Sequence, residues 1–200
     1  ITNAKLAQDI ISGDTALGAE PADTDEFLVS DAGVLKRMDY SYIKGGISEA
    51  DQWRLNTTLS ITSEATITNW ERPDDQESSI DCFEKIGTGM SHSSGTFTFP
   101  STGVWLVRFF AKVQTGAEAA VYTRIYFSKD GTNYDKIATG DLYISNGFNN
   151  TVGCEYLCDV VSTSNDLMQF KAQTSSGTGS VQGHTDYNVT SVTFIRLGDT

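Results

Sequence analysis

The most constraining feature of this sequence is a period of two in its apolar side chains in the middle of the chain. From residue 104 to 113 every second position is apolar, with Trp105, Val107, Phe109, Ala111 and Val113 sharing one parity. Alternate residues of a strand point to opposite faces, whereas a helix repeats every 3.6 residues, so the pattern predicts a strand buried on one face. The same period of two recurs at residues 96–99 and 121–127, which predicts a set of such strands.

Further strands are expected at residues 141–144, 152–161, 167–174 and 189–197, because turn residues separate these segments. About eight short strands between turn signals are typical of an all-β sandwich or barrel. The apolar parity of the strands then predicts which side chains fill the core. They are Phe97, Phe99, Trp105, Val107, Phe109, Ile125, Phe127, Met168 and Phe170.

The chain divides near residue 50 into two parts with different patterns. The segment from Glu26 to Asp39 predicts two short strands around Asp31, Ala32 and Gly33, which form a hairpin signal. One hairpin buries little surface by itself, so we expect residues 1–50 to form a stalk or attachment segment wound with copies of itself. Residues 51–59 are expected to be a linker, and residues 60–200 the head domain.

Charge and hydropathy exclude several classes of function. The formal net charge is −12, and the sequence has no basic cluster with which to neutralise phosphates, so nucleic-acid binding is not expected. The same deficit disfavours an anionic membrane surface, and no apolar run approaches the roughly 18 residues of a membrane span. Because the chain begins with Ile1 rather than Met, we expect a processed product or part of a longer chain.

Residues suited to catalysis or metal binding are sparse, so we expect neither an enzyme nor a cofactor. The two histidines, His92 and His184, do not stand at ligand spacing from a cysteine. The segment from Asp130 to Asp135 superficially resembles a calcium loop, but without a later bidentate Glu it favours a hairpin turn over a cation site. The acidic cluster is expected to be a solvated loop, with a weak divalent-cation site as the alternative; it comprises Asp74, Asp75, Glu77 and Asp81.

The three cysteines do not form a disulfide framework. Cys154 and Cys158 fall on one face of a predicted strand, about 13 Å apart at about 3.3 Å per residue, which is too far to bond. We therefore expect small buried hydrophobic residues, with a bridge from Cys82 to one of the pair as the alternative.

Two stretches of the second part resemble a known family. The run from Phe83 to Val107 resembles the opening strands of the complement-head/tumour-necrosis-factor jelly roll, where a Gly-x-Phe-x-Phe segment, a turn and a Gly-aromatic pair lead into a core strand. Residues 164–171 resemble the penultimate strand of that family, and residues 190–197 its closing strand. The resemblance implies an antiparallel two-sheet jelly roll over residues 60–200 and a homotrimer.

The first part resembles a different group of proteins. The segment from Thr15 to Asp39 is similar to one that recurs in bacteriophage virion and tail-fibre proteins, ending in Asp-Glu-x-Leu-x-Ser-Asp-x-Gly-x-Leu-Lys-Arg ahead of a globular tip; here Phe27, Val29, Ala32 and Val34 occupy the x positions. Together the two resemblances imply a trimeric phage fibre or appendage located on the virion, joined to other virion proteins at its N-terminal side. The alternatives are a capsid or tail decoration protein without a ligand, a secreted complement/TNF-like recognition ligand, and a carbohydrate-processing enzyme on a β-sandwich.

Two groups of residues are candidates for contacts with partners. Some predicted strands carry aromatic residues on the face opposite the core. Because exposed apolar patches are adhesive, we expect these residues to form the trimer interface. They are Phe110, Tyr122, Tyr126 and Phe194. Aromatic and amide residues in the predicted loops are candidates for binding a host-surface glycan or protein; these are Asn133, Tyr134, Phe148, Asn149, Asn150 and His184.

Overall fold

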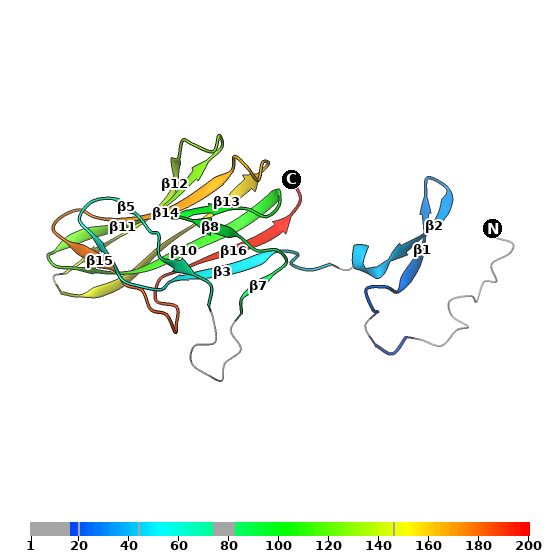
Figure 1. The fold of residues 1–200 in the computed structure, drawn as a ribbon, viewed down its shortest axis with the longest axis horizontal. Helices are drawn as coiled ribbons and strands as arrows, with labels where there is room; N and C mark the ends of the chain where they lie inside the picture. The colour runs from blue at the N-terminus through cyan, green and yellow to red at the C-terminus, as the bar shows by residue number, and fades with distance from the viewer. Residues whose placement is uncertain (1–16, 20, 44, 74–82, 146) are drawn as a thin grey trace. The chain divides into compact units, whose positions relative to one another are not determined.

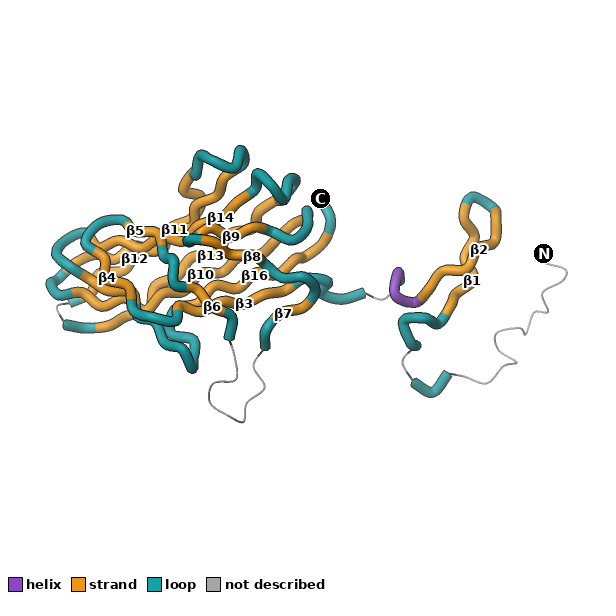
Figure 2. Tube along the Cα trace, in the orientation of Figure 1, coloured by secondary structure: helices purple, strands orange, loops and turns teal. Residues whose placement is uncertain are grey.

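The computed structural model describes residues 17–19, 21–43, 45–73, 83–145 and 147–200. The chain forms two compact units, Ile1–Gly46 and Ile47–Thr200. Figure 1 shows the strands of both units, and Figure 2 distinguishes strands from loops.

The first unit is built around the predicted hairpin, which is confirmed. Strand β1 (Glu26–Asp31) pairs with β2 (Val34–Asp39), and Asp31 lies opposite Val34. Ala32 and Gly33 form the two-residue turn with φ angles of 48° and 83°, as a primed hairpin turn requires. A 3-10 turn, η2 (Tyr40–Tyr42), follows. The hairpin leaves large apolar side chains exposed instead of packing them into a core of its own, namely Phe27, Leu28, Val34 and Leu35.

One layer of the second unit, the head, is an eight-stranded antiparallel sheet that we call the β10 sheet. Its strand order is β4, β15, β10, β16, β3 and β6, with β13 also paired to β10 and β7 to β3. The bounds are β3 Ala50–Leu55, β4 Leu59–Ile61, β6 Trp70–Glu71, β7 Lys85–Ile86, β10 Gly103–Thr115, β13 Asn149–Val160, β15 Gly179–Val181 and β16 Ser191–Gly198.

The other layer is a six-stranded antiparallel sheet, the β11 sheet. Its order is β12, β11, β14, β9 and β8, with β5 also paired to β14. The bounds are β5 Ala65–Thr66, β8 Ser91–Ser93, β9 Thr96–Thr98, β11 Ala119–Ser128, β12 Asp135–Ile144 and β14 Leu167–Thr174. The first strand of the head, β3, lies beside the last, β16. The chain crosses repeatedly between the layers, because β10, β13 and β15 belong to one sheet and β11, β12 and β14 to the other.

The core lies between the two sheets, and all nine residues predicted for it are buried. Phe97 is central, because its ring lies 5.5 Å from Trp53, 5.5 Å from Phe170 and 5.2 Å from Phe194 between centroids. The outward position predicted for Phe194 is wrong, since its side chain is 0% exposed within this cluster. Residues 191–197 carry apolar side chains on both parities, so alternation does not identify the core face of this strand.

The linker expected at residues 51–59 is also wrong over most of its length, because Ala50–Leu55 forms β3 in the β10 sheet. Two buried charged residues, Asp51 and Arg54, interrupt the apolar pattern that would have predicted this strand. The Asp51 carboxylate accepts hydrogen bonds from Arg72 Nη2 at 2.9 Å, Trp53 Nε1 at 3.0 Å and the Met90 backbone N–H at 2.7 Å. Arg54 Nε donates to Glu71 at 2.9 Å, so both charges are compensated inside the fold.

Both cysteines of β13 are free thiols, Cys158 buried and Cys154 half-buried. Burial raises the pKa of the Cys158 thiol to about 12, which keeps it protonated and unreactive at neutral pH. This agrees with the expected small hydrophobic residues. Cys82 lies outside the described residues, and both of its possible partners are free thiols, so the structure does not support the alternative bridge.

The head is expected to lose stability in mild acid because of His92. Its ring packs against Phe97 at 4.8 Å, its Nε2 accepts the Gly95 backbone N–H at 3.0 Å, and burial lowers its pKa. In the unfolded chain the histidine pKa is about 6.5, so on acidification the unfolded chain takes up a proton at a higher pH than the folded head. The stability that neutral His92 contributes is therefore complete above about pH 6.5 and is lost as the pH falls through the folded-state pKa.

We expect the thermal midpoint to fall between pH 7 and pH 5, and to fall less in His92→Gln, as calorimetry can measure. Glu64 does not titrate in this window; burial acts to raise its pKa, but hydrogen bonds from Tyr126 and Arg124 bring it below the ordinary value. An equal fall in the variant and the parent would contradict the assignment to His92.

Candidate functional site

One end of the head, which we call the loop end, gathers three connections between strands. The β10–β11 turn contacts the β14–β15 turn, because the Gly116 backbone N–H donates to the Thr178 carbonyl at 2.9 Å. The β12–β13 connection joins them through the Gly147 N–H, which donates to the Thr115 carbonyl at 3.1 Å. Segments more than sixty residues apart therefore form one surface.

A hollow of about 270 Å³ on the β12–β13 connection contains three of the predicted receptor-loop residues. Phe148, Asn149 and Asn150 line it together with Tyr143. The rings of Phe148 and Tyr143 are 68% and 64% exposed, which is unusual for large aromatic side chains. The Tyr143 hydroxyl donates to the Glu118 carboxylate at 3.3 Å, and the charge of Glu118 raises the pKa of Tyr143. Exposed rings beside amides and a carboxylate can stack on and hydrogen-bond to a ligand.

The other three receptor candidates lie elsewhere. Asn133 and Tyr134 are in the β11–β12 turn, at the opposite end of β12 from Phe148. The Asn133 side-chain amide donates to the Asp130 carboxylate at 2.6 Å, and His184 stacks on Tyr187 with centroids 4.0 Å apart. The structure therefore does not bring the six predicted residues into one site.

The β11–β12 turn is organised by Asp130 as a hairpin turn. Its carboxylate accepts the backbone N–H groups of Thr132 at 2.8 Å and Asn133 at 2.7 Å, and these bonds lower its pKa well below the usual range. Across the described residues, no group of three or more His, Cys, Asp or Glu side chains is placed to hold a metal ion. The acidic cluster at residues 74, 75, 77 and 81 lies outside the described residues.

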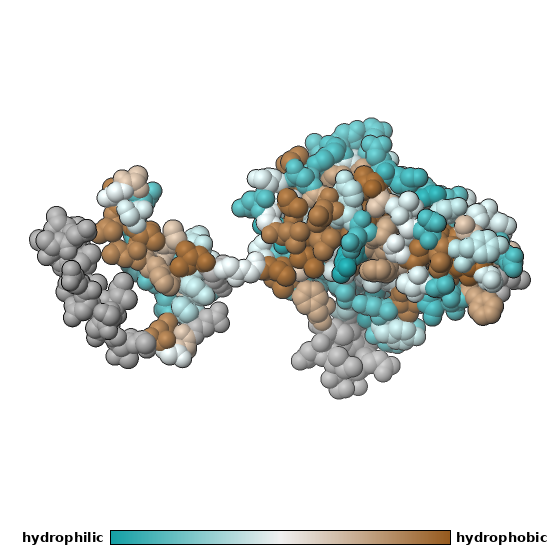
Figure 3. Space-filling view, turned by 180° about the vertical axis from the view of Figure 1, so that it is seen from behind, coloured by the Kyte–Doolittle hydropathy of each residue, from teal (hydrophilic) through white to brown (hydrophobic). Residues whose placement is uncertain are grey.

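The outer face of the β10 sheet carries apolar side chains that we call the apolar strip: Leu106, Phe110, Leu157 and Ile195. An exposed ion pair, Arg108 Nε with Glu155 at 2.9 Å, separates Phe110 from the other three on this face. Leu106 of β10 lies between Leu157 of β13 and Ile195 of β16 in the strand register. Leu157 is 57% and Phe110 45% exposed. Phe110 lies over Gly153, where an added Cβ would meet the ring at 2.3 Å. Figure 3 shows hydrophobic residues gathered on the surface of the head.

Tyr122 and Tyr126, the other predicted interface residues, lie on β11 in the opposite sheet from Phe110. The Tyr126 hydroxyl donates to Glu64 at 2.9 Å, and the Lys171 ammonium lies 4.0 Å from its ring centroid. The Arg124 guanidinium lies 5.0 Å from the Tyr122 ring. Both rings are half-buried among partners in the same chain, so the predicted interface residues do not form one surface.

The antiparallel sheets define an all-β fold, as predicted, and its likeness to TNF-type structures shows that it is a jelly roll. No protein-family model matches the sequence, and no curated protein is significantly similar to it. Among solved structures, the chain is similar to the Eiger TNF from S. frugiperda, with 11% identity and a TM-score of 0.56 over 76% of this chain and 93% of that one.

Murine APRIL is similar with 9% identity and a TM-score of 0.54, over 74% of this chain and 98% of that one. The PRD1 vertex protein P5 matches with 13% identity and a TM-score of 0.45, over 77% of this chain and all of that one (100%). At these identities the likeness to Eiger and APRIL establishes the fold. Within the described residues, no helix has the length and hydropathy needed to cross a membrane.

Proposed function

We propose that this protein is a structural subunit of a bacteriophage virion, a trimeric fibre or appendage whose head attaches the particle to a host surface. The observation that carries the proposal is the hairpin of the first unit. The segment that resembles phage fibre proteins folds as this hairpin and, among the described residues of the unit, leaves Phe27, Leu28, Val34 and Leu35 exposed. Such a unit needs further chains to bury these side chains, as a stalk of several copies would.

The apolar strip supports three copies of the head around an axis. Cyclic symmetry gives every copy the same contacts, and a sheet face with exposed leucine and phenylalanine side chains is costly in a monomer. Three heads also present three binding surfaces at once, so each contact with a host can be weak while the whole attachment is strong. The proposal is for a binding protein rather than an enzyme.

Removing residues 1–46 is expected to leave folded heads that associate less tightly. The head has its own core, and the hairpin side chains that would be lost belong to the other unit. Sedimentation equilibrium of both lengths measures the association, and circular dichroism measures the fold. If the shortened chain unfolds instead, the two units depend on each other for stability and the stalk assignment is wrong.

Replacing Phe148 by alanine is expected to reduce adsorption to host cells at least tenfold without changing the thermal midpoint, because the ring is 68% exposed. The test incubates fluorescently labelled protein with a panel of bacterial strains and counts bound label by flow cytometry. Phe83→Ala, which removes another exposed ring, is the matched control. Folded trimers that bind none of the strains would favour a decoration protein without a ligand.

A further inference from the structure

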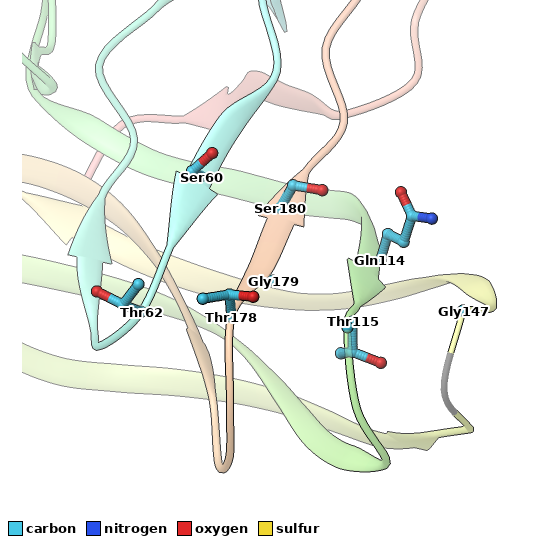
Figure 4. Close-up of a pocket in the computed structure, with 9 residues that line it drawn as sticks. Ser60, Thr62, Gln114, Thr115, Gly147, Thr178, Gly179 and Ser180 are labelled. Carbon is cyan, nitrogen blue, oxygen red and sulfur yellow. The ribbon is translucent and has the colours of Figure 1, made fainter.

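A second depression of the loop end is lined by serine, threonine, glutamine and glycine residues. This hydroxyl cleft has a volume of about 540 Å³ and lies over β4, β15 and the end of β10 (Figure 4). Nine residues line it, among them Ser60, Gln114, Gly116 and Ser180. Every one of them is uncharged.

The strand register explains why these polar side chains share a face. Ser180 of β15 pairs with Gln114 of β10 on one side and with Ser60 of β4 on the other. Their neighbours in the same strands, including Val113, Val181 and Ile61, have the opposite parity and are buried in the core. The three polar side chains therefore form a row across three adjacent strands.

The cleft retains hydrogen-bonding capacity that the protein does not use. In the row, the Ser180 hydroxyl accepts from Gln182 Nε2 at 2.7 Å and keeps its own proton for another acceptor. Thr115 has the parity of Val113 and is buried on the core side of β10, so it lies outside this row.

We propose that the hydroxyl cleft binds a segment of a neutral oligosaccharide. This rests on the proposed function, since it names the ligand class of the loop end. Sugar hydroxyls both donate and accept, as do the serine, threonine and glutamine side chains of the cleft. An anionic ligand would find no cation in the lining and would approach a chain of net charge −12.

A peptide docking as an added strand does not fit this surface. Such a peptide needs a free strand edge with unpaired backbone groups. The cleft lies on the face of β10, β15 and β4, and not along the outer edge of β4, the last strand of the sheet. Phe148 follows Gly147 of the cleft in the chain, is 68% exposed and lines the hollow of the β12–β13 connection, where its ring can stack on a sugar.

The test uses the full chain on a glycan array that carries neutral, sialylated, sulfated and uronic-acid oligosaccharides, followed by an NMR titration with the neutral oligosaccharide that binds best. Ser60→Ala combined with Ser180→Ala removes two hydroxyls from the row. Gly116→Leu fills the cleft; a Cβ there meets only Thr178 atoms at 3.4 Å, which is ordinary contact. The control combines Ser91→Ala with Ser93→Ala, two exposed serines of β8.

We expect binding to neutral oligosaccharides that weakens at least tenfold in both cleft variants and changes less than twofold in the control, with thermal midpoints unchanged. Binding to anionic glycans alone, to no glycan on the array, or with equal affinity in all variants would overturn the proposal. Adsorption to bacteria separates the two claims: cells that still bind both cleft variants but not Phe148→Ala would reject the cleft and retain the adhesive function.

Discussion

Replacing Phe97 by alanine is expected to lower the free energy of unfolding of the head by about 3–5 kcal/mol, the range for a fully buried phenylalanine. The Phe97 side chain is 0% exposed and lies at the centre of the core cluster. Its ring contacts those of Trp53, Trp70, Phe170 and Phe194, which come from both sheets. These bulky rings cannot collapse fully into the space, so a cavity adds to the lost burial.

Urea unfolding followed by tryptophan fluorescence measures this effect. The matched control is Phe83→Ala, which removes the same atoms from a ring that is 47% exposed and should change the free energy by less than about 0.5 kcal/mol. A loss below about 1 kcal/mol for Phe97→Ala would mean that the aromatic cluster is not the centre of the core.

Replacing Leu157 by lysine is expected to convert a trimer into folded monomers at micromolar concentration. Leu157 lies beside Leu106 on the apolar strip and is 57% exposed in the single chain, so lysine is tolerated there in the monomer. In a trimer the same change would bury an unpaired charge at three interfaces, each of which also loses about 1.5–3 kcal/mol of leucine burial.

Light scattering coupled to size-exclusion chromatography measures the mass, and circular dichroism confirms that the variant is folded. Thr139→Lys, on an exposed position of β12 in the other sheet, adds the same charge and should leave the trimer intact. A monomeric parent protein would refute the trimer itself. A trimer that survives Leu157→Lys would place the interface elsewhere, for instance at Tyr122 and Tyr126.

Local sequence patterns predicted those strands in which only one parity is apolar. In residues 104–113 one parity is wholly apolar, and the structure buries all five of its side chains in β10; they are Trp105, Val107, Phe109, Ala111 and Val113. The hairpin of the first unit was predictable for a related reason, since Ala32 and Gly33 supply the positive φ angles that a two-residue turn needs. By contrast, β3 was missed because Asp51 and Arg54 interrupt its apolar pattern, and only their distant partners explain why they are buried.

The candidate binding residues could be recognised by type but not by location. Phe148, Asn149 and Asn150 are adjacent in the chain, so they share a hollow, whereas Asn133 and His184 belong to other parts of the head. The hydroxyl cleft had no signal in the sequence. Ser60, Gln114 and Ser180 are unremarkable alone, and they meet only because β15 pairs with both β10 and β4.

The sequence by itself thus determined the all-β class, the nine predicted core side chains and the turn of the hairpin, because these depend on the parity and conformational preference of near neighbours. Only the tertiary structure decided that Phe194 faces inward, that β3 is a strand of the β10 sheet, and that the apolar strip and the hydroxyl cleft exist. These features depend on pairing between strands that are far apart in the chain. The residues of one strand do not specify which other strand pairs with it, or which side chains will compensate its buried charges.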